Sequence, residues 1–168
     1  MEKFKAELMS AALELGAEKA RILTFDDICF DPRTLLKCFF GCRGGFHFCP
    51  RPGDAANSLT YSQIIKEYKW GVILRTGDLR TGQKITLALE SKAFLAGYHF
   101  ALGATECGSC ASCTFPEGQP CRNKKDMRLP LYAFGIDVYK TVRGLGWELE
   151  VVQRKGDPSK NITAVFVE

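Results

Sequence analysis

The sequence predicts a single α+β domain in which helices cover one mixed sheet of roughly four strands, with two cysteine-rich metal-binding loops between elements. Alternating or continuous apolar runs predict the strands, and stretches with helical spacing predict about four or five helices. The two kinds of segment do not alternate regularly along the chain. At 168 residues, 46% of them hydrophobic, residues 1–168 are long and apolar enough to form one domain with a sizeable core.

The first elements are a helix and a strand. The apolar residues of the N-terminal helix share one stripe, and a glycine at position 16 ends it: Phe4, Leu8, Ala11, Ala12 and Leu15. The run ARILTF (20–25) predicts a strand. Asp31-Pro32 then indicates an N-cap and first helical position for the short segment RTLLKC.

The middle of the chain predicts a helix, a strand and a long helix. Thr60 and Gln63 suggest a capping box that opens a helix through Tyr68. WGVILRT (70–76) predicts a strand, and the glycines of GDLRTGQ (77–83) indicate a turn. Residues 84–102 form the strongest helical pattern, with Gly103 after it.

The C-terminal part predicts a helix and a hairpin. Residues 131–144 carry apolar side chains at helical spacing and end at a glycine pair. WELEVVQ (147–153) and NITAVFV (161–167) each alternate in polarity, and KGDPSK (155–160) supplies the turn between them.

Composition narrows the class of protein. No apolar run reaches the roughly 18 residues that a membrane span needs, so no membrane association is expected. The N-terminal stretch carries Glu2, Glu7 and Glu14 and lacks the continuous apolar region of a secretory signal. We therefore expect a cytoplasmic protein, whose eight cysteines serve metal ligation or redox chemistry and not structural disulfides. The net charge of +4 permits an acidic partner but does not by itself indicate nucleic acid.

The strongest chemical signal is TECGSCASCTFPEGQPCRN (105–123), with the spacing C-x2-C-x2-C-x7-C. A run of three cysteines with a later fourth is typical of [4Fe–4S] loops, whereas zinc usually takes two separate C-x2-C pairs. The residues between the cysteines are small enough for the backbone to lie close to a cube: Gly108, Ser109, Ala111 and Ser112. The motif favours a [4Fe–4S] cluster, with zinc as the alternative, on Cys107, Cys110, Cys113 and Cys121.

A second set of cysteines, Cys38-x3-Cys42-x6-Cys49-Pro50, lies in the loop CFFGCRGGFHFCPRPGD. Three thiolates are one short of a closed site. Cys29 or His47 could complete it, the latter as a Cys3His zinc site. Other options are a [4Fe–4S] cluster with one open iron, or ligands that cross between the two motifs.

Cys29 and the two histidines also have structural interpretations that involve no metal. Cys29 stands between Ile28 and Phe30, so a buried apolar cysteine is the competing interpretation. His47 is interpreted as a loop or core histidine, and His99, within the long helix, as structural.

The two cysteine motifs in this order, with four flanking stretches, resemble a prokaryotic family of predicted metal-binding proteins, domain of unknown function 2284. Those stretches are KARILTFDDICFDPRTLLKC, CPRP, EYKWGVIL and GIDVYKTVRGLGW, which together span most of the chain. The resemblance implies metal binding by seven cysteines: Cys38, Cys42, Cys49, Cys107, Cys110, Cys113 and Cys121. Cys29 falls where relatives carry an ordinary apolar residue.

The chain departs from the family pattern around the motifs. Cys49-Pro50-Arg51-Pro52 replaces the family's Cys-Pro-Pro, and Cys121-Arg122-Asn123-Lys124 lacks a proline after the fourth cysteine. Residues 131–134, Leu-Tyr-Ala-Phe, replace the family's Ser-Met-Glu-Ala. The cysteines themselves are intact.

For other residues near the motifs, the sequence gives weaker evidence of a functional role. In the basic run RNKKDMR (122–128), Arg122 is expected to touch the metal site as a cofactor-binding residue, and the rest are interpreted as a solvated loop. Asp137 is interpreted as structural. No nucleotide-binding glycine pattern occurs, and the two histidines do not support a hydrolytic triad.

The function expected from the sequence is a small iron–sulfur protein with one or two [4Fe–4S] clusters, which transfers electrons or assists an anaerobic redox enzyme. A redox partner protein is then expected. The first alternative is a zinc-stabilised binding module, although nucleic acid is unfavoured because the basic residues are not interleaved with aromatic ones. The second is an enzyme with an open-iron cluster at Cys38, Cys42 and Cys49.

Overall fold

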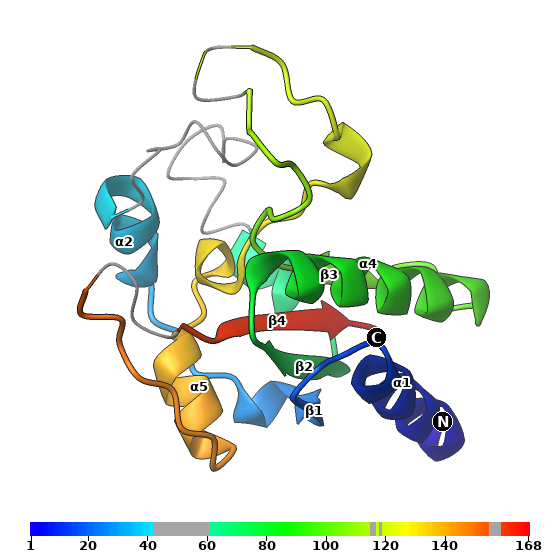
Figure 1. Cartoon of the computed structure of the whole chain (residues 1–168). Helices are drawn as coiled ribbons and strands as arrows, with labels where there is room; N and C mark the ends of the chain where they lie inside the picture. The colour runs from blue at the N-terminus through cyan, green and yellow to red at the C-terminus, as the bar shows by residue number, and fades with distance from the viewer. Residues whose placement is uncertain (42–60, 115–116, 118, 155–158) are drawn as a thin grey trace.

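The computed structural model describes residues 1–41, 61–114, 117, 119–154 and 159–168 (Figure 1). Along the chain the elements are α1 (Glu2–Glu14), β1 (Lys19–Thr24), η1 (Phe25–Asp27), α2 (Thr34–Gly41), β2 (Trp70–Thr76), α4 (Leu79–Leu95), β3 (Leu102–Ala104), η4 (Lys124–Asp126), η5 (Leu131–Phe134), α5 (Val138–Gly144) and β4 (Asn161–Phe166). Residues 61–65 are also helical. Within these described ranges, no helix is both long and apolar enough to cross a membrane.

The four strands form one sheet in the order β1-β2-β4-β3. Every neighbouring pair is antiparallel, so the expectation of a mixed sheet is corrected. The cause is the position of β4. Strands β2 and β3 run in the same direction on either side of helix α4 in the sequence, but β4 inserts between them and no parallel pair forms.

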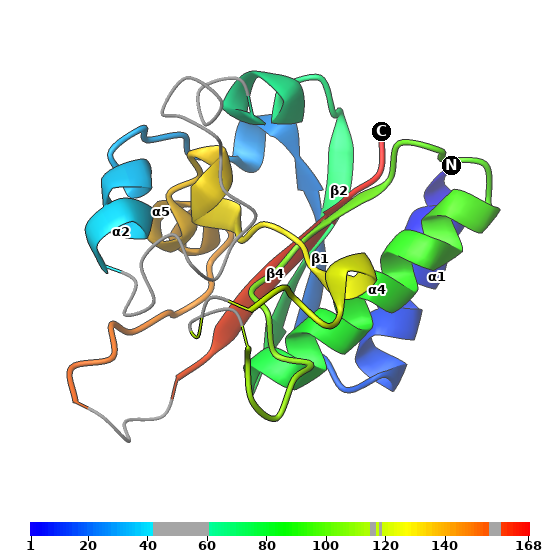
Figure 2. The same ribbon diagram turned by 90° about the horizontal axis from the view of Figure 1, so that it is seen from above.

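Helices cover both faces of this sheet, as Figure 2 shows, with α1 and α4 on one side and α2 and α5 on the other. The side chains of β2 alternate between two cores. Trp70, Val72 and Leu74 pack with the α1 and α4 side, whereas Ile73 joins the α5 side. A strand buried on both faces is expected to be apolar along its whole length, which explains the run WGVIL. The α+β class and the helix-covered sheet are thus confirmed.

Helix α4 begins and ends earlier than the predicted 84–102. Asp78 caps its start by accepting a hydrogen bond from the backbone N–H of Thr81, at 2.9 Å. Gly97, with φ of 100°, follows its end. The GDLRTGQ stretch is therefore the helix start and not a turn, and Gly103 lies inside strand β3.

The predicted C-terminal hairpin is wrong in its first arm. Residues 147–153 form no strand, whereas β4 pairs with β2 and β3 on its two sides. β2 pairs along the whole of one edge of β4, β3 pairs with the other edge over Ala164–Phe166, and residues 147–153 form no ladder with either edge. The alternation of WELEVVQ reflects burial instead, because Trp147 and Leu149 pack on the α5 side of the sheet.

The other predicted elements agree with the structure more closely. The N-terminal helix and the strands at 20–25 and 70–76 are confirmed within one or two residues. The helix predicted over 131–144 is divided into η5 and α5, because Gly135 adopts a left-handed φ of 78°. Asp137 then caps α5 by accepting from the backbone N–H of Lys140. Helix α2 begins at Thr34, after the predicted Asp31-Pro32 start, and Thr60 lies outside the described residues.

The α4 core makes a direct prediction. Leu89 is 1% exposed and Leu95, on the same helix, is 82% exposed. Leu89→Ala should lower the free energy of unfolding by about 2–5 kcal/mol, because it leaves a cavity between α4 and the sheet. Leu95→Ala should change it by less than about 0.5 kcal/mol. Urea unfolding of the two variants measures both values, and equal losses would contradict the assigned packing.

Candidate metal centre

The four cysteines of the C-x2-C-x2-C-x7-C motif come together in space. They lie on the irregular segment after β3, at one end of the molecule (Figure 1). All four are free thiols. They line one cavity of about 110 Å3, whose other lining residues are Gln83, Ser109, Asn123 and Met127.

This cavity is close to the protein surface. Cys107 and Cys113 are exposed as residues, and Cys110 and Cys121 are partly buried. Burial of its sulfur nevertheless raises the pKa of the Cys107 thiol; a hydrogen bond from Gln83 opposes this, and the three neighbouring cysteines add to it. A metal that binds Cys107 must therefore displace a proton from it.

Gln83 of helix α4 is the residue that fixes the start of the cysteine segment. Its side chain is fully buried. Oε1 accepts hydrogen bonds from the backbone N–H groups of Gly108 (2.6 Å) and Ser109 (2.8 Å), and from the Ser109 hydroxyl (2.8 Å). Nε2 donates to the carbonyl of Asp126 at 2.7 Å and lies 3.8 Å from Sγ of Cys107.

Asn123 provides a second contact to sulfur. Its Nδ2 donates to Sγ of Cys110, with the two atoms 3.1 Å apart. Two amide side chains, one before and one after the cysteine run in sequence, thus direct N–H groups at two of the four thiols. Such donors favour the thiolate form that a metal needs.

The segment lies directly against the first turn of α4. A Cβ added at Gly108 would be 2.7 Å from both the backbone N of Arg80 and the backbone C of Leu79. Only glycine permits this approach. Arg80 also donates from Nε to the carbonyl of Gly108, at 3.4 Å. The position of the cysteine segment is therefore set by α4.

The two ends of the segment are joined at its base. The backbone N–H of Thr105 donates to the carbonyl of Leu129 at 3.0 Å. Arg128 forms a half-buried ion pair with Glu90 of α4, which also accepts the backbone N–H of Gly103. Glu90 accordingly raises the pKa of Arg128. Arg128 was expected to be solvated, and this ion pair corrects that expectation.

The donor set fits a metal by its chemistry. Four thiols around one cavity suit either a [4Fe–4S] cluster or tetrahedral zinc. In the part of the chain that the structure describes, no three or more His, Cys, Asp or Glu side chains are arranged so that they could bind a single metal ion. The thiols border a shared space instead.

The structure describes only part of the first cysteine motif. Cys38 lies in helix α2, while Cys42, His47 and Cys49 lie outside the described residues. The fourth ligand of this motif, and the open-iron enzyme based on it, stay predictions.

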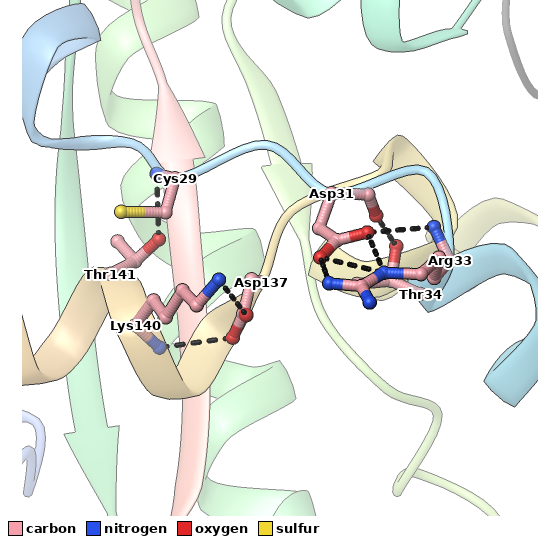
Figure 3. A network of polar contacts seen from close by, with 7 residues as sticks. All are labelled: Cys29, Asp31, Arg33, Thr34, Asp137, Lys140 and Thr141. Atoms are coloured by element: carbon pink, nitrogen blue, oxygen red, sulfur yellow. Dashed lines mark hydrogen bonds and ion pairs between the residues drawn. The ribbon is translucent and has the colours of Figure 1, made fainter.

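Cys29 lies elsewhere, beside helix α5 (Figure 3). Its backbone N–H donates to Oγ1 of Thr141 at 3.0 Å, and its carbonyl accepts from the N–H of Asp137 at 2.8 Å. Its thiol does not line the four-cysteine cavity. The backbone of Cys29 thus joins the segment between η1 and α2 to α5, and its role as a ligand stays a prediction.

Arg122 is exposed. It is not among the described residues that line the cavity, whereas its neighbour Asn123 is. Arg80, Lys124 and Lys125 are exposed as well, and so are the acidic Asp78 and Glu117. His99 lies in the turn after α4, where its ring packs on Phe94 with centroids 5.6 Å apart.

Sequence reasoning did not identify Gln83 or Asn123 as site residues. A weak signal exists for Gln83, because it stands four positions before Leu87 and so on the same side of α4 as that apolar residue. A glutamine on a buried helix face requires polar partners from elsewhere in the fold. Asn123 carries no such signal, since asparagine is ordinary in a loop.

Comparison with known proteins agrees with the metal-binding interpretation. No curated protein and no solved structure matches the chain. The family model described as "Predicted metal-binding protein (DUF2284)" matches residues 21–167, a range that contains both cysteine motifs and all of the sheet except the first two residues of β1. The chain belongs to the DUF2284 family of predicted metal-binding proteins.

Proposed function

We propose that this protein is a small iron–sulfur protein in which Cys107, Cys110, Cys113 and Cys121 hold a [4Fe–4S] cluster. The observation that carries the proposal is that all four thiols line one cavity of about 110 Å3. When bound, such a cluster accepts and releases single electrons. The protein would serve as an electron carrier or as an accessory to a redox enzyme.

The size of the cavity favours a cluster over a single ion. Zinc binds four thiolates at about 2.3 Å, which leaves no open space between the sulfurs. The four thiols instead border an open cavity of about 110 Å3 that also reaches Gln83, Ser109, Asn123 and Met127. A zinc-stabilised binding module remains the competing function, and metal analysis separates the two.

The surrounding residues suit an anionic centre. Gln83 and Asn123 direct amide N–H groups at Cys107 and Cys110. Hydrogen bonds to sulfur and nearby charge both tune the reduction potential of such centres. The exposed arginines and lysines around the segment offset the negative charge of four thiolates.

Exposure of the site suits exchange of electrons with a second protein. Cys107 and Cys113 are exposed, so a docked partner would approach the centre closely. Arg80, which contacts Gly108, and the residues Arg122, Lys124 and Lys125 after the last cysteine form an exposed basic margin beside it, against two exposed acids, Asp78 and Glu117. This margin fits a redox partner with an acidic docking face.

The first test is the metal itself. Anaerobic purification followed by iron, acid-labile sulfide and zinc analysis should give about four irons and four sulfides per chain for one cluster, or about eight of each for two. Electron paramagnetic resonance of the reduced protein provides an independent signal. Stoichiometric zinc without sulfide would exclude the proposed function.

Cys110→Ser tests the ligand set. It should remove about four irons per chain, because one iron of the cubane loses its protein ligand and the cluster at this exposed site is no longer held. Ser112→Ala, a change of similar size on the same exposed segment, should leave the iron content at the wild-type value. Equal iron content in the Cys110 variant and the wild type would show that Cys110 is not a ligand.

The basic margin can be tested without knowing the partner. Lys125→Glu should slow oxidation of the reduced protein by ferricyanide several-fold at low ionic strength and speed its oxidation by hexaamminecobalt, because it weakens attraction of anions to the site. Lys3→Glu, on α1, makes the same charge change elsewhere and should have a smaller effect. Stopped-flow absorption measures these rates, and no difference between the two variants would contradict the steering role.

A further inference from the structure

Gln83 is a buried polar residue whose position is not explained by packing of the hydrophobic core. It is a polar side chain with no exposed surface on α4, a helix whose other side packs Ile85 and Leu89 into the core. A buried amide is costly unless its donors and acceptors are paired. Among the described residues, the hydrogen-bond partners of its side chain lie in the cysteine segment and its flank, from Cys107 to Asp126.

The amide uses both of its ends. Oε1 accepts from Gly108 and Ser109 beside the first cysteine, while Nε2 donates to Asp126 beyond the last one. Gln83 therefore links the beginning and the end of the segment that holds all four thiols. Closing a loop in this way reduces the conformational entropy that metal binding would otherwise have to overcome.

The same amide also faces sulfur. Nε2 lies 3.8 Å from Sγ of Cys107, longer than the 3.1 Å contact from Asn123 to Cys110. A donor directed at a ligand sulfur stabilises the more negative, reduced state of a metal centre more than the oxidised one. Since Gln83 is fully buried, water does not compete for its amide N–H.

We propose that Gln83 is a positioning residue for the metal centre: it holds the cysteine segment in a metal-ready arrangement and raises the reduction potential of the cluster bound there. The effect on potential rests on the proposed iron–sulfur function. The effect on arrangement applies to any metal that the four thiols bind.

Two substitutions separate these roles. Gln83→Met keeps a similar volume but removes every hydrogen bond. Gln83→Glu keeps an acceptor for Gly108 and Ser109, but it loses the donor to Asp126 and Cys107 and adds negative charge near the thiols. Leu89→Ala is the control for lost stability, and Gln63→Glu, at an exposed position, is the control for charge.

Arrangement is measured by titrating the anaerobic, reduced apoprotein with Co2+ and following thiolate-to-cobalt absorption. Gln83→Met should bind Co2+ about 10- to 100-fold more weakly than the wild type. Both controls should bind like the wild type. Wild-type affinity in a folded Gln83→Met variant would overturn the positioning role.

Potential is measured by redox titration of the iron-loaded proteins. The midpoint reduction potential should be highest in the wild type, lower in Gln83→Met and lowest in Gln83→Glu. Gln83→Met removes the hydrogen-bond donor to sulfur, and Gln83→Glu replaces that donor with a negative charge. Leu89→Ala and Gln63→Glu should keep the wild-type midpoint. An unchanged midpoint in both Gln83 variants, or an equal change in Leu89→Ala, would overturn the tuning role.

Failure of the proposed function gives a different result. If the purified protein holds zinc and no sulfide, the iron–sulfur assignment is wrong while the Co2+ affinities still test Gln83. Should Gln83→Met not fold, Ser109→Ala removes only the hydroxyl donor to Oε1. It should weaken Co2+ binding by about threefold or more, and wild-type affinity there would overturn the positioning role.

Discussion

The packing of helix α4 against the sheet is the interaction on which the rest of the structure depends. Its apolar face is buried against β2 and β4, and the buried hydroxyls of Thr86 and Thr163 form a hydrogen bond of 2.8 Å between helix and strand. This contact fixes the position of the helix along β4. One turn earlier, Gln83 and the Gly108 contact then place the cysteine segment. The core and the candidate metal centre are thus parts of one packing arrangement.

The sequence predicted the elements best where a single local pattern determined them. The run WGVIL is apolar throughout because both faces of β2 are covered, and it was placed correctly. Helix α4 was shifted because the glycines near its start resembled a turn, whereas Asp78 caps the helix and Gly82 is buried within it. The strand predicted for the first arm of the hairpin was wrong, because alternating polarity indicates only which side chains are buried. Trp147 is buried without being in a strand.

For the site, the cysteine spacing was sufficient to group four ligand candidates that the fold brings to one cavity. Spacing could not identify the residues that support them. Gln83 precedes the first of these cysteines by 24 positions, and only the docking of α4 brings it to the segment. Supporting residues of this kind depend on tertiary packing, which a pattern along the chain does not record.

The position of β4 has a consequence for the order of events during synthesis. β4 is the last strand to be made, yet it lies between β2 and β3 in the sheet. Until the ribosome has produced it, β3 lacks its partner strand and α4 lacks the threonine that fixes its position. Since domains generally fold as units, the nascent chain exposes its cysteines before their supporting scaffold exists. The ordered arrangement of the four thiols is therefore complete only after β4 has been made.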